Sequence, residues 1–299
     1  MTGANGFIGK YLVDRLIGDG YTVYKHRRSE EGDLKDRKSL DRYEGIDILY
    51  HLAAINFVPT SWEKPDEYIN NNISALVNVL EFCRKENAKL VYISSYMYGE
   101  PLYLPVDENH RCIISSPYHL SKRIGEEICE FYSTHFNIDV AIIRPFNVYG
   151  MGQNAHFLLP KVYNQVSDES KDRIEVFNLA PKRDYIYVED LVDVLVKLIP
   201  HITGCEIYNV GSGKSYSVGE VIEIIQAEFG TMKEVIETNS YRNTDVMDCV
   251  ADISHIRNVV GSISITPIEA GIHKWHVMNS ELSDHESDHG KSVNGNTRI

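Results

Sequence analysis

The chain has 299 residues, of which 43% are hydrophobic, so it can form one large α/β domain or a core domain with a smaller lobe. Its formal net charge of −13 argues against a nucleic-acid or anionic-membrane partner, because both would repel it. Its five cysteines stand far apart in the sequence, which suggests neither a disulfide framework nor a zinc site. The composition therefore predicts reduced cysteines and no metal site.

The N-terminus does not resemble a secretory signal, because no basic region followed by an apolar stretch is present. The most apolar later segment, residues 191–199, is interrupted by Asp193 and Lys197, which disfavours a membrane-spanning helix. We therefore expect a soluble, cytoplasmic protein.

Helical and strand patterns alternate along the first half of the chain. Apolar residues at helical spacing predict helices over 7–16, 73–80 and 118–136. Short apolar runs predict strands over 21–25, 46–52, 90–93 and 140–143. The alternation predicts an α/β fold with a parallel, doubly wound sheet of the Rossmann type, in which residues 1–150 form the dinucleotide-binding domain.

After Gly150 the pattern becomes looser and richer in turns. We expect a helix over 188–199, a strand over 206–210 and a helix over 218–229. Residues 151–278 are predicted to form mainly a substrate-binding lobe, while a segment near 183–212 returns to the first domain. Residues 279–299 contain almost nothing apolar, so we expect a disordered tail.

A glycine-rich segment, residues 2–9, leads directly into the first predicted helix. Its glycines would let backbone amides approach a pyrophosphate at the positive helix N-terminus, although such loops often only make turns. Two later segments supply a possible adenine contact and a close-packed strand end, which favours a cofactor site. The expected cofactor-binding residues here are Gly3, Asn5, Gly6, Phe7, Ile8, Gly9, Asp33, Leu34, Leu52, Ala53 and Ala54.

Tyr118 and Lys122 stand one turn apart on a predicted helix that Ser116 can cap, so the phenol and the ammonium share one face. A surface tyrosine beside a surface lysine is the alternative interpretation. Ser94 ends the strand over 90–93, at the carboxyl edge where ligands of open α/β sheets bind. A nearby ammonium lowers a tyrosine pKa, so Tyr118 could act as a base and Ser94 as a hydrogen-bond donor to the reacting oxygen.

These motifs and several others follow one another in a familiar order. The chain resembles the extended short-chain dehydrogenases/reductases of the NAD-dependent epimerase/dehydratase family, which modify nucleotide sugars, up to about Trp275. The segments that carry the resemblance are the glycine loop, 51–54, 58–61, Asn72, 94–99, 116–122, 144–150 and 183–188.

The resemblance implies a nicotinamide cofactor, NAD or NADP, whose site includes Asn72, Tyr118 and Lys122. It implies a nucleotide-diphosphate sugar as the bound partner. The substrate-binding residues that it implies are Ser94, Asn147, Arg183 and Arg242. Arginine forks suit phosphate oxygens, although each arginine alone could be a solvated surface group.

For an epimerase, the resemblance implies oxidation at C4 of the sugar, with Tyr118 removing the hydroxyl proton while hydride passes to the cofactor. The keto sugar then rotates and receives the hydride on its other face. The family also implies a homodimer, formed through a helix bundle near 72–87 and 118–136.

Three departures from the family pattern bear on function. Dehydratases of the family carry an acidic pair after the catalytic hydroxyl residue, where this chain has Ser95 and Tyr96, so dehydration is disfavoured. Arg27 and Arg28 stand where NAD-preferring members carry an aspartate, and an arginine there can accept the 2′-phosphate of NADP. Two solvent-facing arginines on a loop are the alternative.

The third departure is at the start of the chain. The family places a buried central strand before the glycine loop, where this sequence has only Met1. We expect either a shortened sequence or a sheet with an unfilled position and weak cofactor binding, and favour the first.

The sequence therefore favours a nucleotide-sugar 4-epimerase. An NADP-dependent nucleotide 4-keto-sugar reductase is the main competitor, ahead of a dehydratase and of a non-catalytic cofactor-binding module. The presence of Ser94, Tyr118 and Lys122 together speaks against the last of these.

Overall fold

The computed structural model describes residues 1–238 and 246–291. They divide into two compact units, each with its own contacts. The first unit comprises the described residues of 1–148, 181–216 and 242–265, and the second comprises those of 149–180, 217–241 and 266–299.

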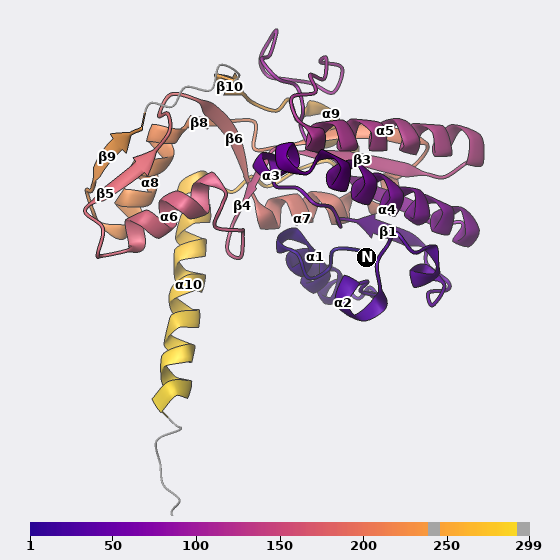
Figure 1. Ribbon diagram of the computed structural model, residues 1–299, viewed down its shortest axis with the longest axis horizontal. Coiled ribbons are helices and arrows are strands. Elements are labelled where there is room, and N and C mark those ends of the chain that lie inside the picture. The colour runs from indigo at the N-terminus through magenta and orange to yellow at the C-terminus, as the bar shows by residue number, and fades with distance from the viewer. Residues whose placement is uncertain (239–245, 292–299) are drawn as a thin grey trace, which may run out of the picture. The chain divides into compact units, whose positions relative to one another are not determined.

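The first unit contains a sheet of four parallel strands. They are β1 (Ile48–His51), β2 (Lys89–Ile93), β3 (Val140–Pro145) and β7 (Cys205–Val210), in the order β1-β2-β3-β7. Helix α4 (Pro65–Glu86) connects β1 to β2, and α5 (Pro117–Phe136) connects β2 to β3. A helix between consecutive parallel strands is the Rossmann arrangement, so the predicted fold class is confirmed (Figure 1).

The two faces of this sheet are buried against different helices, because side chains alternate along each strand. Leu90, Tyr92 and Ile142 belong to the core under α4 and α5. Their neighbours Val91 and Ile93 belong to the core on the other face. There they meet α1 (Phe7–Gly18) and α7 (Val188–Lys197), which lie across the sheet from α4 and α5 (Figure 1).

The start of the chain contributes two residues beside β1. Thr2 forms single parallel bridges with both His26 and His51, through bonds such as Thr2 N–H to Tyr50 O at 2.9 Å. The prediction of a strand over 21–25 is therefore wrong. Only the next residue, His26, forms a bridge, because the segment with which it pairs is two residues long. The strand predicted over 46–52 is confirmed as the shorter β1.

Further elements of the first unit surround this sheet. The helices are α2 (Arg28–Glu31), α3 (Val58–Glu63), α9 (Ser254–Val260) and the short 3-10 turns η1 (Arg37–Leu40) and η2 (Ile199–His201). A second sheet has the order β10 (Asp248–Cys249), β6 (Lys182–Tyr187), β4 (Asn147–Tyr149), with β8 (Ser215–Ser217) also paired to β6.

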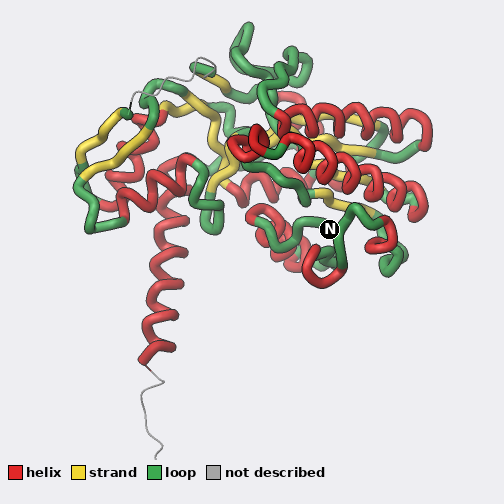
Figure 2. The backbone as a smooth tube through the Cα atoms, in the orientation of Figure 1, coloured by secondary structure: helices red, strands yellow, loops and turns green. Residues whose placement is uncertain are grey.

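The second unit is built on three helices and one strand pair (Figure 2). Its elements are α6 (Leu158–Ser167), β5 (Arg173–Val176), α8 (Val218–Phe229), β9 (Glu234–Glu237) and α10 (Ile268–Lys291). Strands β5 and β9 pair in parallel. Tyr163 of α6 stacks on Trp275 of α10 with ring centroids 4.5 Å apart, which anchors the start of α10.

Helix α10 differs from the sequence-based expectation. Its backbone stays helical to Lys291, whereas composition predicts disorder from Asn279. The hydrogen bonds of a helix are local, so a helix that starts on a core can continue past it without burying apolar side chains. Within the described residues, no helix combines the length and apolar character needed to cross a bilayer.

Candidate active site

The glycine loop makes a tight turn at the N-terminus of α1. Gly3 has a φ of +70°, and a Cβ on it would lie 2.7 Å from Ala53 N, closer than real side chains approach. A Cβ on Gly9 would lie 2.1 Å from Gly3 O. Gly6 precedes the first residue of α1 and provides no side-chain cap, so the amides of the first turn point outward with a partial positive charge. This cradle fits a dinucleotide pyrophosphate.

The segment after β1 lies against this loop, as the sequence predicted. Leu52 N donates to Thr2 O at 3.4 Å, and Ala53 N donates to Thr2 Oγ1 at 3.3 Å. Asn72, from α4, is buried and brackets Ile55 with two hydrogen bonds of 2.9 and 3.1 Å. Its amide also donates to Ser121 Oγ at 2.9 Å. Asn72 therefore ties the strand end to α5.

Arg27 follows His26, which bridges Thr2, so it lies beside the glycine loop. Its guanidinium is held by two carboxylates, with Arg27 Nη2 to Glu31 Oε1 at 2.9 Å and an ion pair to Glu30. Both acids repel a phosphate, so Arg27 would have to leave them to bind one. Asp33 pairs with Arg28 at 2.8 Å, and Leu34 is buried.

Helix α5 brings the phenol and the ammonium together. Ser116 caps it by accepting from His119 N at 3.1 Å, and Pro117 occupies its first position. Tyr118 and Lys122 are 9% and 4% exposed, so the surface interpretation of the pair is wrong. Lys122 Nζ donates to Ile93 O at 2.6 Å and lies 4.9 Å from the centre of the Tyr92 ring.

Burial dominates the pKa values of both groups. It raises the pKa of Tyr118 to about 12, against the opposing effect of a hydrogen bond with Ser95. It lowers the pKa of Lys122 to about 8. At neutral pH, Lys122 is therefore mostly charged and Tyr118 protonated, and further stabilisation of the phenolate must come from the bound state.

The structure separates the two serines that follow β2. Ser94 is 2% exposed, and its Oγ donates to Glu126 Oε1 at 2.7 Å. Ser95 is half-buried, its Oγ donates to Tyr96 O at 3.3 Å, and its hydroxyl acts to lower the pKa of Tyr118. Ser94 is therefore held by Glu126 of α5, and its predicted catalytic role stays a prediction. Strand alternation places Ser94 in the row of Leu90 and Tyr92 that faces α5, the helix that carries Tyr118.

A second polar group lies near the other strand ends. Tyr96 OH donates to Asn147 Oδ1 at 3.1 Å, and Asn147 Nδ2 donates to Asp184 O at 2.9 Å. Tyr96 also hydrogen-bonds Arg183, whose Nη1 donates to Val246 O at 2.6 Å. The structure thus brings Asn147 and Arg183 together through Tyr96. The sequence analysis had considered Tyr96 only because it stands where dehydratases of the family carry an acidic residue. Arg242 lies outside the described residues.

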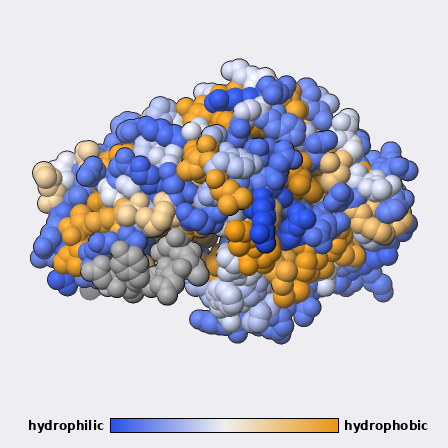
Figure 3. Space-filling view, turned by 90° about the horizontal axis from the view of Figure 1, so that it is seen from above, coloured by the Kyte–Doolittle hydropathy of each residue, from blue (hydrophilic) through white to orange (hydrophobic). Residues whose placement is uncertain are grey.

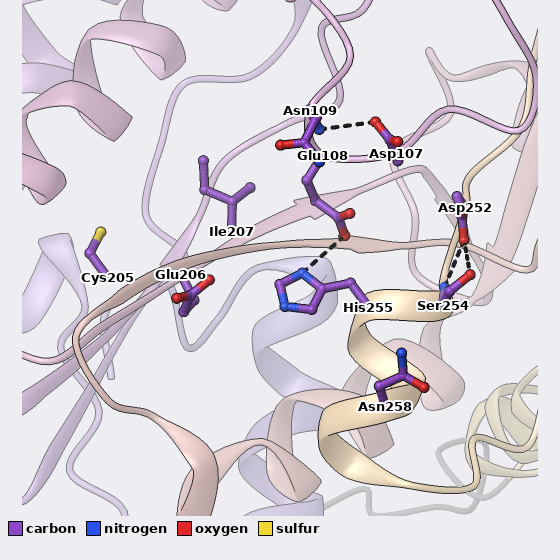
Figure 4. A pocket seen from close by; sticks show the side chains of 10 residues that line it. All are labelled: Asp107, Glu108, Asn109, Cys205, Glu206, Ile207, Asp252, Ser254, His255 and Asn258. Atoms are coloured by element: carbon purple, nitrogen blue, oxygen red, sulfur yellow. Dashed lines mark hydrogen bonds and ion pairs between the residues drawn. The ribbon is translucent and has the colours of Figure 1, made fainter.

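A cavity of about 600 Å³ lies beside β7, away from these groups. Four of its ten lining residues are acidic, and His255 of α9 lies 3.8 Å from one of them, Glu108 (Figure 4). None of the residues predicted for catalysis or cofactor binding lines this cavity. Its size alone therefore does not mark the active site.

The parallel sheet, the glycine cradle and the buried tyrosine–lysine pair define a dinucleotide-binding enzyme. Residues 1–211 match the family described as the NAD dependent epimerase/dehydratase family. The chain belongs to this family, and it is an enzyme that uses a nicotinamide cofactor.

Two curated relatives and one solved structure illustrate the similarity. A putative UDP-glucose 4-epimerase from Methanocaldococcus jannaschii is 35% identical over 264 residues, covering 79% of this chain and 84% of the relative. A GDP-6-deoxy-D-talose 4-dehydrogenase from Aggregatibacter actinomycetemcomitans is 30% identical, covering 88% and 90%. The crystal structure of UDP-glucose 4-epimerase from Thermotoga maritima superimposes with a TM-score of 0.86 at 23% identity, covering 94% and 98%.

Proposed function

We propose that the chain is a nucleotide-sugar 4-epimerase. The observation that carries the proposal is the buried pair of Tyr118 and Lys122 with the half-buried Ser95, at the carboxyl end of β2 beside the glycine cradle. The similarity to a putative UDP-glucose 4-epimerase supports the same activity.

Each residue has a role that follows from its chemistry. Tyr118 takes the proton from the C4 hydroxyl of the sugar and returns it, acting as base and then as acid. The Lys122 ammonium favours the phenolate, and Ser95 donates a hydrogen bond to the reacting oxygen. The nicotinamide cofactor, when bound, supplies the hydride chemistry. Asn147 and Arg183 hold the nucleotide diphosphate.

Replacing Tyr118 by Phe tests the catalytic assignment. We expect the rate of interconversion of UDP-glucose and UDP-galactose to fall by about 10³-fold, because the variant lacks the proton-transfer group. Binding of the nicotinamide nucleotide, measured by calorimetry, should survive. Unchanged turnover would refute the role of Tyr118, and an inactive wild type with both sugars would redirect the search to other nucleotide sugars.

A nucleotide 4-keto-sugar reductase that uses NADP is the second candidate. It is favoured by Arg27, which lies beside the glycine loop, and by the similarity to a sugar-nucleotide 4-dehydrogenase. Mass spectrometry of the nucleotide released from the denatured protein distinguishes the two. Retained NAD supports an epimerase that recycles its hydride. Retained NADP supports the reductase and implies that Arg27 leaves Glu30 and Glu31 to bind the 2′-phosphate.

We also propose a homodimer through α4 and α5. The two helices pack along each other, and Trp62, Phe131 and Phe136, on or beside them, are exposed by 38 to 65%. Apolar patches among polar ones are visible on the face of the molecule in Figure 3. An elution volume equal to that of a monomer would contradict the dimer. The cytoplasmic location expected from the sequence stays a prediction.

A further inference from the structure

A buried carboxylate on α5, that of Glu126, lies at the centre of a network of hydrogen bonds. Glu126 stands one turn after Lys122 and two turns after Tyr118 on α5, and it is 2% exposed. Its Oε1 accepts from Ser94 Oγ at 2.7 Å and from Arg144 Nε at 2.9 Å. Its Oε2 accepts from Arg144 Nη2 at 2.7 Å and from Arg123 Nη1 at 3.4 Å. The carboxylate is thus fully hydrogen-bonded in its charged form.

The partners of Glu126 extend across three neighbouring strands. Ser94 follows β2, and Arg144 of β3 pairs in register with Asn209 of β7. Arg144 Nη1 donates to Tyr98 OH at 3.0 Å, and Tyr98 OH donates in turn to Asn209 Oδ1. Asn209 N donates to Glu108 Oε1 at 2.7 Å, and Glu108 lines the cavity in Figure 4. The network therefore fixes the carboxyl ends of β2, β3 and β7 to α5.

Stability alone does not explain such a network. The desolvation of a buried ion pair offsets most of its attraction, so apolar residues of similar size often serve equally well. What the pair does provide is fixed geometry, because Arg144 binds Glu126 through two parallel hydrogen bonds. Ser94 is held by the same carboxylate, and the hydroxyl of the next residue, Ser95, acts to lower the pKa of Tyr118.

We propose that Glu126 is a positioning residue for the reaction. Through Ser94 and Arg144 it fixes the strand end that carries Ser95 against Tyr118, and its charge supports the Lys122 ammonium. The proposal rests on the catalytic roles proposed above for Tyr118, Lys122 and Ser95. It adds a residue that contacts neither substrate nor cofactor.

The charges around Lys122 explain the second part of the role. Burial lowers the Lys122 pKa to about 8, while Cys129 and, to a smaller extent, Glu126 act to raise it. The titratable groups that face Lys122 are His51 of β1, Tyr92 of β2, and Tyr118, Glu126 and Cys129 of α5. Burial keeps His51 neutral, with a pKa of about 3, and raises the pKa values of Tyr92 and Cys129. Glu126 is the carboxylate among these groups, and it is ion-paired with Arg144 at 2.7 Å.

Ser94→Ala tests the geometric part, because it keeps the Glu126–Arg144 pair and removes only one donor. Ser212→Ala is a matched control, since Ser212 Oγ also donates at 2.7 Å to a buried carboxylate, Asp184, in the same unit. We expect kcat of Ser94→Ala to fall by about 10- to 100-fold with little change in KM, because a shift near 1 Å at the reacting groups has this effect. Ser212→Ala should keep the wild-type kcat. Equal kcat values in the two variants would overturn the proposal.

Crystal structures of the same two variants provide a readout that needs no substrate. The position of Ser95 relative to Tyr118 should change in Ser94→Ala and stay as in the wild type in Ser212→Ala. An unchanged distance between Ser95 Oγ and Tyr118 OH in Ser94→Ala would overturn the proposal, even if the wild type showed no epimerase activity. This comparison therefore separates a failure of the positioning role from a failure of the proposed function.

Glu126→Gln tests the charge. In the pH profile of kcat, the loss of activity on the alkaline side should begin at lower pH than in the wild type, because Lys122 loses its proton more easily without the carboxylate. A folded Glu126→Gln protein with the wild-type profile would overturn the electrostatic part. If this variant does not fold, because Arg144 is left unpaired, Ser94→Ala decides the proposal.

Discussion

The two ends of the main sheet are built in different ways. At β2, β3 and β7, complete strands end in a buried side-chain network around Glu126 and Arg144. Beside β1, the chain contributes only Met1 and Thr2, joined to their neighbours by a few backbone bonds. A small apolar cavity adjoins Met1, lined among others by Tyr43, Leu49 and Phe82.

This difference indicates how the proposed site divides its tasks. The groups proposed for proton transfer belong to α5 and to the segment that follows β2. There the neighbouring strands form complete ladders and are joined to α5 by the network around Glu126. The glycine cradle stands on the short end, where its position depends on Thr2. Changes at the first end should act on the rate of reaction, and changes at the second on stability and cofactor affinity.

Of the variants below, Ser95→Ala should have the largest effect, and it acts on the rate. The variant removes the hydroxyl proposed to donate to the reacting oxygen, and loss of one such donor costs about 10²-fold in kcat. Steady-state kinetics with UDP-glucose would measure it, and the affinity for the nicotinamide nucleotide should not change. If Ser95→Ala kept full activity while Ser94→Ala lost it, the serine that acts on substrate would be Ser94, as the sequence first predicted.

Gly9→Ala should affect the cofactor end instead. Its Cβ would lie 2.1 Å from Gly3 O, so the start of α1 must move, at a cost of about 2 kcal/mol in the free energy of unfolding. Affinity for the cofactor should fall with it. Gly18→Ala is the control on the same helix, because a Cβ there meets nothing within 4 Å. It should stabilise the protein by about 0.5 kcal/mol. Similar melting curves for the two variants would contradict this account of the loop.

Filling the position beside β1 should give a smaller gain in stability. Met1 and Thr2 adjoin a small cavity lined by apolar side chains such as Leu49 and Phe82. About six apolar residues added before Thr2 would cover this cavity. We expect about 1 kcal/mol, or roughly 2 to 4 °C in melting temperature. A Gly/Ser extension of equal length is the control, and equal melting temperatures would argue against the expectation.

The fold could be predicted from the sequence where patterns are long. The alternating pattern predicted α5, β2 and most of β3, but only the middle of α4, for which 73–80 was predicted and the helix runs over Pro65–Glu86. The segment over 21–25 has the composition of a strand but lacks a partner long enough for a ladder, and propensity alone does not show this.

The site was predictable in its residue types but not in every contact. Tyr118 and Lys122 follow from helical spacing, which fixes their shared face. Ser94 and Ser95 are adjacent and chemically identical, so only the direction of the strand end separates them. Glu126, Arg144 and Tyr96 act through partners far away in sequence, and no local pattern predicts those contacts.

The last prediction concerns pH and gives opposite signs for activity and stability. The Lys122 pKa is lowered by burial from 10.5 to about 8, so activity that needs the ammonium should be lost as the pH rises through about 8. Between about 8 and 10.5 the unfolded chain binds the proton that the folded chain has released, so this group adds stability as the pH rises. Denaturant unfolding of the wild type and of Lys122→Met across this range would isolate the contribution. A wild-type stability that falls relative to Lys122→Met above pH 8 would mean that the folded protein holds the Lys122 proton more tightly than the unfolded chain, and that the ammonium is stabilised in place.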